Sequence, residues 1–167
     1  MKTAAERRSL LNKTMADNID NGNDCFSCTG ICCTSASNSM MITKQEAQDL
    51  YDFLKAEDRI NNKLIEDLKS NIKRYRLDVQ IPGIKQFRRT YTCPFYAGCA
   101  KGCTISRHSK PYGCLAFNPL ESNQKEGGNC AHLPNVMERQ LEANNESADQ
   151  EKSPIPVALL EIIGTSI

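Results

Sequence analysis

The stretch TKQEAQDLYDFLKAEDRINNKLIEDLKSNI, residues 43–72, predicts two consecutive helices. Thr43 and Glu46 form a capping box, in which each side chain satisfies a backbone donor at a helix start, so the first helix should begin at Lys44. Its apolar residues recur at helical spacing, at Ala47, Leu50, Phe53 and Leu54. A second stripe recurs every four residues, at Ile60, Leu64, Leu68 and Ile72. Stripes of this kind are typical of helix faces that pack in a core.

Weaker patterns surround these two helices. Residues 2–18 read as a short amphipathic helix, which the Asn- and Asp-rich turn at 18–24 ends. Short strands are predicted over 39–42 and 84–95, a short helix near Ser109, and a final apolar helix over 157–167 after the polar stretch 138–154. The expected fold is mainly α with a few short strands (α+β), one small domain organised around a cysteine or metal cluster. The predicted segments are 1–24, 25–133 and 134–167.

Composition restricts the compartment and the kind of partner. The 167 residues carry 21 basic and 20 acidic side chains, so net charge gives no overall attraction to nucleic acid or to a membrane, and electrostatic arguments must be local. The N-terminus lacks the apolar core of a secretory signal, and no stretch approaches the roughly 20 apolar residues that span a bilayer. We therefore predict a cytoplasmic protein without a membrane association. In that reducing compartment, nine cysteines are expected to be ligands or reactive groups rather than disulfides.

The first cysteine group is CFSCTGICC, residues 25–33. Cys25 and Cys28 have the two-residue gap that lets one tight turn direct two sulfurs to one metal ion. Cys32 and Cys33 are adjacent, and neighbouring side chains diverge, so they are expected to point to different places. A thioredoxin-like dithiol is the less favoured alternative, because no strand of a βαβ unit is predicted upstream of Cys25.

The second cysteine group lies in a basic stretch. Its cysteines are Cys93, Cys99, Cys103, Cys114 and Cys130, and glycines occur between them. From Val79 to Leu120 there is no Asp or Glu, whereas six basic side chains are present: Lys85, Arg88, Arg89, Lys101, Arg107 and Lys110. This charge has three interpretations, namely compensation of metal thiolates, a solvated basic face, or a phosphate-binding patch.

Several of these residues occur in the order of a known family. Cys25, Cys28, Cys32 and Cys33, then Cys93-Pro94-Phe95, Cys103-Thr104-Ile105, and Pro111 with Cys114 and Phe117 resemble the YkgJ-like CxxCxxCC cysteine-cluster family. That family is described as a zinc- or iron-chelating domain, and the resemblance covers about residues 25–130. Lys110 and Leu115 stand where the family usually has arginines. Longer relatives include flagellin lysine methylases, thought to carry an iron–sulfur centre.

The predicted ligands are the cysteines that the resemblance includes, together with the one that follows them: Cys25, Cys28, Cys32, Cys33, Cys93, Cys103, Cys114 and Cys130. The expected cofactor is Zn²⁺ or an iron–sulfur cluster of the [4Fe–4S] type, both of which use thiolate ligands. Cys99 is expected to be a spare thiol, and His108 and His132 are expected at the surface rather than on the metal. No catalytic residue is assigned.

Three functions remain open at the level of the sequence. The leading hypothesis is a metal-binding protein. The alternatives are an iron–sulfur redox or group-transfer enzyme related to the flagellin lysine methylases, and a metal-shaped interaction module for an acidic partner or RNA. Nucleic acid is the less favoured partner, and the apolar C-terminal segment is a candidate docking element for another protein, although short apolar helices usually complete a core.

Overall fold

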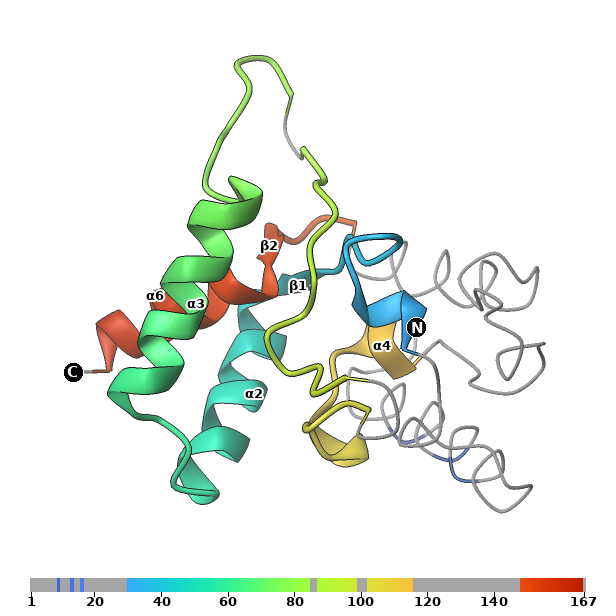
Figure 1. Ribbon diagram of the computed structural model, residues 1–167, viewed down its shortest axis with the longest axis vertical. Helices are drawn as coiled ribbons and strands as arrows, with labels where there is room; N and C mark the ends of the chain where they lie inside the picture. The colour runs from blue at the N-terminus through green and yellow to red at the C-terminus, as the bar shows by residue number, and fades with distance from the viewer. Residues whose placement is uncertain are drawn as a thin grey trace.

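The computed structural model describes residues 30–84, 87–98, 102–115 and 148–166, together with positions 9, 13 and 16. It is mainly helical with one small sheet, as predicted (Figure 1). In chain order the elements are η1 (Ile31–Cys33), β1 (Met41–Thr43), α2 (Lys44–Ala56), α3 (Asn62–Tyr75), η2 (Arg107–Ser109), α4 (Tyr112–Leu115), β2 (Lys152–Pro154) and α6 (Ile155–Thr165). Ser9, Lys13 and Ala16 are helical, and the rest of the predicted helix over 2–18 lies outside the described residues.

Helix α2 begins at Lys44, as the sequence predicts, whereas α3 begins at Asn62, after Ile60, the first residue of its predicted stripe. The Thr43 hydroxyl accepts a hydrogen bond from the Glu46 amide at 3.2 Å, and the Glu46 carboxylate accepts one from the Thr43 amide at 2.8 Å. The predicted capping box is therefore confirmed. At the start of α3, the Asn61 side chain accepts from the Leu64 amide at 2.9 Å. Short polar side chains thus satisfy donors that a helix start otherwise leaves unpaired.

Helices α2, α3 and α6 form the core. Figure 1 shows α6 packed with α2 and α3, and places η1 (blue) and α4, which carry described cysteines, to the right of these helices. Fully or almost fully buried side chains come from all three helices: Ala47, Leu50, Leu54, Leu68, Leu159, Ile162 and Ile163. The apolar C-terminal segment is a core helix here, because its buried face contacts both α2 and α3. No helix in the described ranges combines the length and apolar character needed to cross a bilayer.

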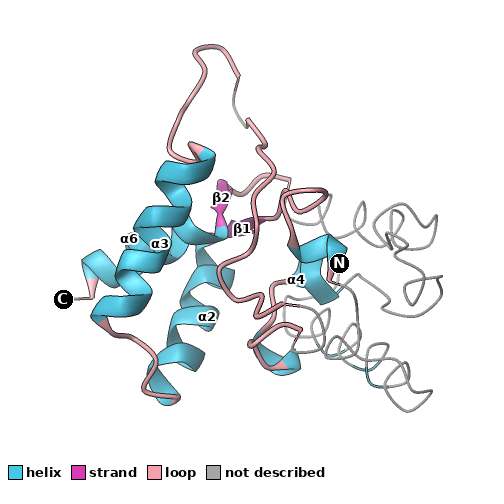
Figure 2. Cartoon of the chain, viewed as in Figure 1, coloured by secondary structure: helices cyan, strands magenta, loops and turns pink. Residues whose placement is uncertain are grey.

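The sheet joins distant parts of the chain. Strand β1 pairs antiparallel with β2, and Met41 lies opposite Pro154 (Figure 2). Each strand leads directly into a helix, β1 into α2 and β2 into α6. The pairing therefore fixes the start of α6 next to the start of α2.

The predicted strand over 84–95 is wrong for its described residues, 84 and 87–95, which are not in a strand. The backbone there bonds to turns and side chains instead of to a neighbouring strand. The Tyr91 amide donates to the Asn38 carbonyl at 2.9 Å, and the Asn38 side-chain amide donates to the Tyr91 carbonyl at 2.9 Å. The Asn71 side chain donates to the Thr92 carbonyl at 2.9 Å. Aromatic and β-branched content predicts an extended backbone and does not specify its partner.

Tyr91 connects this segment to the core. Its side chain is fully buried, and its hydroxyl donates to the Met40 carbonyl at 2.7 Å while accepting from the Ile155 amide at 3.1 Å. One phenol thus joins the approach to β1 with the first residue of α6. Burial raises the pKa of Tyr91, so the hydroxyl remains a donor at neutral pH.

Candidate thiol site

Five of the eight predicted metal ligands lie in the described residues. These are Cys32, Cys33, Cys93, Cys103 and Cys114, each partly buried and none of them in a disulfide. Cys25, Cys28 and Cys130 lie outside the described residues, as do Cys99 and His132. His108 lies on η2 and is exposed.

The backbone brings the first cysteine group to the second. Gly30 precedes η1 with a φ of 70°, and the Cys33 amide donates to the Gly30 carbonyl at 2.8 Å. The Cys33 carbonyl then accepts from the Cys93 amide at 2.7 Å, across 60 positions of the chain. This hydrogen bond places the end of CFSCTGICC beside the start of the second group.

Tyr96 adds a second contact between the groups. A β-carbon at Gly30 would overlap the Tyr96 ring, so the ring covers the backbone of that glycine. Glycine meets two requirements there, since it tolerates the left-handed backbone and has no side chain to collide with the ring.

The chain turns back after Tyr96 and brings Cys103 towards Cys93. Tyr96 and Cys103 form an isolated antiparallel bridge, and the Thr104 amide donates to the Phe95 carbonyl at 2.9 Å. The Arg59 guanidinium holds this turn against the end of α2, donating to the Thr104 carbonyl and hydroxyl at 2.9 Å each. The turn is therefore attached to the helical core.

A buried carboxylate holds the short helix that carries Cys114. The predicted short helix begins later than Ser109, since a 3-10 turn at Arg107–Ser109 precedes α4 at Tyr112–Leu115. The Tyr112 amide donates to Glu46 at 2.8 Å, and only 6% of Glu46 is exposed. Gly113 lies against Met40, whose sulfur and methyl group occupy the space a β-carbon would need.

The thiols interact electrostatically with one another. The pKa of Cys33 is raised by its hydrogen bond with the Cys32 side chain, then by burial and by the neighbouring Cys32 and Cys103 sulfurs. Burial raises the pKa of Cys93, and Cys103 and Cys33 raise it further. Burial also raises the pKa of Cys114, followed by the effect of Cys93. Proximity of several sulfurs opposes ionisation of each, because like charges would gather in a partly dry site.

Lys110 carries a positive charge that acts on several of these thiols. It is 7% exposed, and its charge lowers the pKa of Cys33, Cys93 and Cys114. The basic residues of this stretch therefore differ in exposure, since Arg88 is exposed whereas Lys110 is buried near the cysteines. The sequence showed that Lys110 stands where the family usually has arginine, but it did not predict that Lys110 is buried.

The described residues alone do not make a complete metal site. Within them, no three His, Cys, Asp or Glu side chains are grouped so that they could hold an ion. The donor chemistry suits a thiophilic metal, because thiolates are the usual ligands of structural zinc and of iron–sulfur clusters. Any complete site would therefore need additional ligands or a rearrangement of these thiols.

No family model, curated protein or solved structure matches the chain. The resemblance to the YkgJ-like family therefore stays a prediction from the cysteine-containing motifs.

Proposed function

We propose that the protein binds a metal through both cysteine groups, holding zinc or an iron–sulfur cluster. The observation that carries the proposal is the hydrogen bond from the Cys93 amide to the Cys33 carbonyl at 2.7 Å, which joins the two cysteine groups across 60 positions of the chain. Electrostatics support it, because the neighbouring Cys33 sulfur raises the pKa of both Cys93 and Cys114. We include Cys25, Cys28, Cys32, Cys103 and Cys130 as further candidate ligands on the basis of the sequence.

Lys110 supports the same proposal through charge. Four thiolates around one divalent ion leave a net charge of minus two, which is unfavourable in a partly dry site. A buried ammonium group beside the thiols offsets part of that charge. None of the five described cysteines is in a disulfide, which suits a reducing compartment, and we propose the cytoplasm.

The test is metal analysis of the anaerobically purified full chain. We expect zinc or iron in stoichiometric amount, and reduced metal content in Cys93→Ser. Cys99→Ser is the matched control, because Cys99 has no counterpart in the family resemblance, and it should retain the metal. Circular dichroism checks that both variants keep their helices. Metal-free protein with all thiols accessible to a thiol reagent under native conditions would exclude the proposal.

The same preparation separates the two candidate metals. An iron–sulfur centre gives a brown protein with acid-labile sulfide, whereas a zinc site gives a colourless one. The redox or group-transfer alternative requires the brown protein, so a colourless, zinc-containing preparation would remove it.

A further inference from the structure

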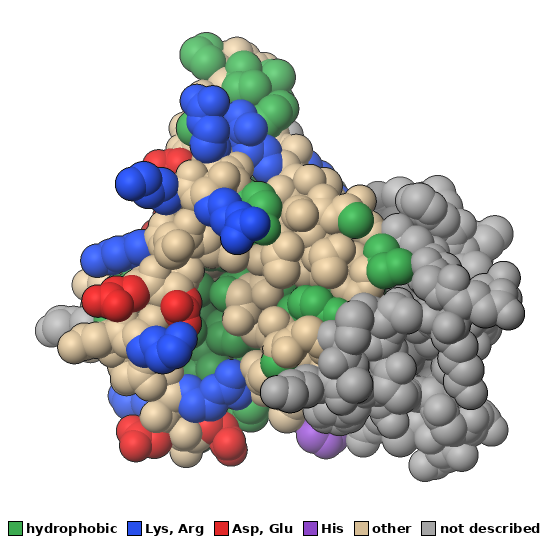
Figure 3. All heavy atoms as spheres, in the orientation of Figure 1, with side chains coloured by type: hydrophobic (Ala, Val, Ile, Leu, Met, Phe, Trp, Pro, Cys, Tyr) green, Lys and Arg blue, Asp and Glu red, His purple; other side chains and the backbone are tan. Residues whose placement is uncertain are grey.

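The segment between α3 and Tyr91 projects from the body of the protein. We call it the projecting loop and define it by its described residues, 77–84 and 87–90. Ile84 is 49% exposed and Phe87 is 36% exposed, and they are the exposed large hydrophobic side chains of the described residues. Figure 3 shows hydrophobic atoms at the end of a projection, with Lys and Arg side chains directly beneath them. The loop therefore presents an apolar tip above a basic base.

The tip has a defined backbone shape. The Ile84 amide donates to the Ile81 carbonyl at 3.1 Å, which closes a turn with Pro82 and Gly83 at its centre. Gly83 has a φ of 83°, and this combination of proline followed by a left-handed glycine is typical of a type II turn. The apolar residues are consequently carried on a convex turn rather than in a groove.

Basic residues surround the base of the loop. Residues 73–90 contain six Lys or Arg residues and a single acidic residue, Asp78. Lys73 and Arg74 occupy the last turn of α3, and Arg76 and Arg88 are exposed. The Arg89 guanidinium lies 4.7 Å from the centre of the Phe87 ring. Although the whole chain is nearly neutral, this end of the molecule is strongly positive.

We propose that the projecting loop docks on an anionic lipid surface, with Ile84 and Phe87 entering the interface and the arginines contacting lipid phosphates. The charge complementarity is direct, because clustered Lys and Arg residues are attracted to acidic lipids. An apolar tip beside cations matches the two layers of a membrane interface, apolar within and anionic outside. This proposal departs from the sequence-based prediction of no membrane association, which considered only the charge of the whole chain, and it is independent of the metal site.

The shape favours a lipid surface over nucleic acid. Proteins that bind single strands use a basic groove lined with aromatic faces on which bases stack. Here the tip is convex and includes aliphatic Ile84, and the Phe87 ring is already in contact with Arg89. These features suit insertion among lipid head groups better than base stacking.

The test uses the full chain and vesicles of phosphatidylcholine with or without phosphatidylserine. We expect sedimentation with the mixed vesicles, weaker binding to pure phosphatidylcholine, and a fall with added salt. Arg88→Glu should weaken binding at least about fivefold, since one cation near the surface contributes about that factor. The double variant Ile84→Ser, Phe87→Ser should abolish it.

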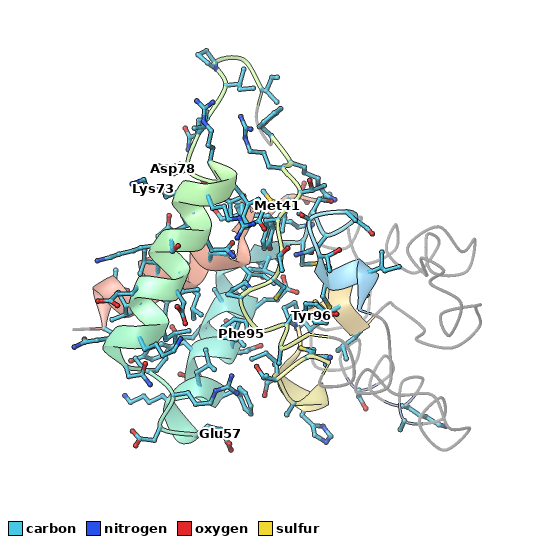
Figure 4. The ribbon with its side chains drawn as sticks, in the orientation of Figure 1. Met41, Glu57, Lys73, Asp78, Phe95 and Tyr96 are labelled. Carbon is cyan, nitrogen blue, oxygen red and sulfur yellow. The ribbon has the colours of Figure 1, made fainter. Side chains whose placement is uncertain are left out.

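Lys55→Glu is the matched charge control. Lys55 is exposed and close in sequence to Glu57, which Figure 4 places at the end of the molecule opposite the projecting loop. It should bind as the unmodified chain does. Because the chain has no tryptophan, Phe87→Trp gives a single indole reporter, whose emission should shift to the blue on the mixed vesicles. Any of four results would overturn the proposal: no sedimentation, equal binding to neutral vesicles, an indole emission that does not shift, or arginine-dependent binding to an RNA pool alone.

Discussion

The Glu46 carboxylate joins the start of α2 to the start of α4. One oxygen accepts from the Thr43 amide at 2.8 Å, and the other accepts from the Tyr112 amide at 2.8 Å, 66 positions away. The residue is almost fully buried. A helix cap within the core thus also supports the short helix that carries Cys114.

We predict that Glu46→Gln destabilises the fold by about 1–3 kcal/mol, because its NH₂ group would face a backbone donor and leave it unpaired. Urea denaturation should show the loss as a lower transition midpoint. Glu66→Gln is the control, since Glu66 is exposed on α3 and should change the midpoint little. Equal midpoints for both variants would contradict the double role of Glu46.

Gly30 and Gly83 allow the cost of a left-handed backbone to be measured apart from the cost of a steric overlap. Gly30 and Gly83 both have φ values in the left-handed region, 70° and 83°. A β-carbon at Gly30 would meet the Tyr96 ring, whereas one at Gly83 would meet nothing within 4 Å. The two positions therefore differ in surroundings rather than in backbone conformation.

Both Gly→Ala substitutions should cost about 1–2 kcal/mol for the left-handed backbone. Gly30→Ala should cost measurably more, because the Tyr96 ring must also move. Thermal melting would compare them, and Tyr96→Ala should reduce the additional cost in a double-mutant cycle. Equal melting temperatures for Gly30→Ala and Gly83→Ala would mean that the contact between Gly30 and Tyr96 contributes nothing.

Local patterns predicted the helices well. The start of α2 follows from the spacing of Thr43 and Glu46, and the buried faces of α2 and α3 follow from apolar periodicity, because both depend only on neighbouring residues. The predicted strand over 84–95 is wrong for its described residues, because composition indicates an extended backbone and does not identify its hydrogen-bond partners. Its partners, Asn38 and Asn71, belong to other parts of the chain.

The arrangement of the thiols depended on such long-range contacts. The sequence could not distinguish Cys32 from Cys33, since the difference arises where Cys93 bonds to the Cys33 carbonyl. It also did not predict that Lys110 is buried whereas Arg88 is exposed. The sequence also could not show that Glu46 accepts a hydrogen bond from the Tyr112 amide, because Tyr112 is far away in sequence.

Adjacent cysteines in the first group should differ in importance. The pKa of Cys33 responds to Cys103 and Lys110 of the second group as well as to Cys32, and Cys33 in turn raises the pKa of Cys93 and Cys114. If a metal is held between the groups, Cys33→Ser should lower its content at least severalfold, and Cys32→Ser should lower it less. Elemental analysis of the two purified variants measures this. A greater loss in Cys32→Ser would reverse the assignment.

The metal-free and metal-loaded proteins should respond to pH in opposite directions. In the metal-free protein, burial and neighbouring sulfurs raise the pKa of Cys93 and Cys114 above the ordinary value of 9.0. As the pH rises through 9.0, thiols of the unfolded chain lose protons while these thiols keep theirs, so the unfolded chain binds fewer protons. Stability is therefore retained below that pH and falls above it.

Metal binding reverses this dependence, because bound thiolates have already lost their protons and acid competes for them. We predict that the melting temperature of the metal-loaded protein falls as the pH drops below about 6, whereas that of chelator-treated protein falls as the pH rises above about 9. At neutral pH, removing the metal should lower the melting temperature by roughly 10 °C, since a few kcal/mol shift a chain of this size by that amount. Melting curves recorded across pH with and without a chelator test all three statements. Identical curves for the two samples would show that no metal is coupled to folding.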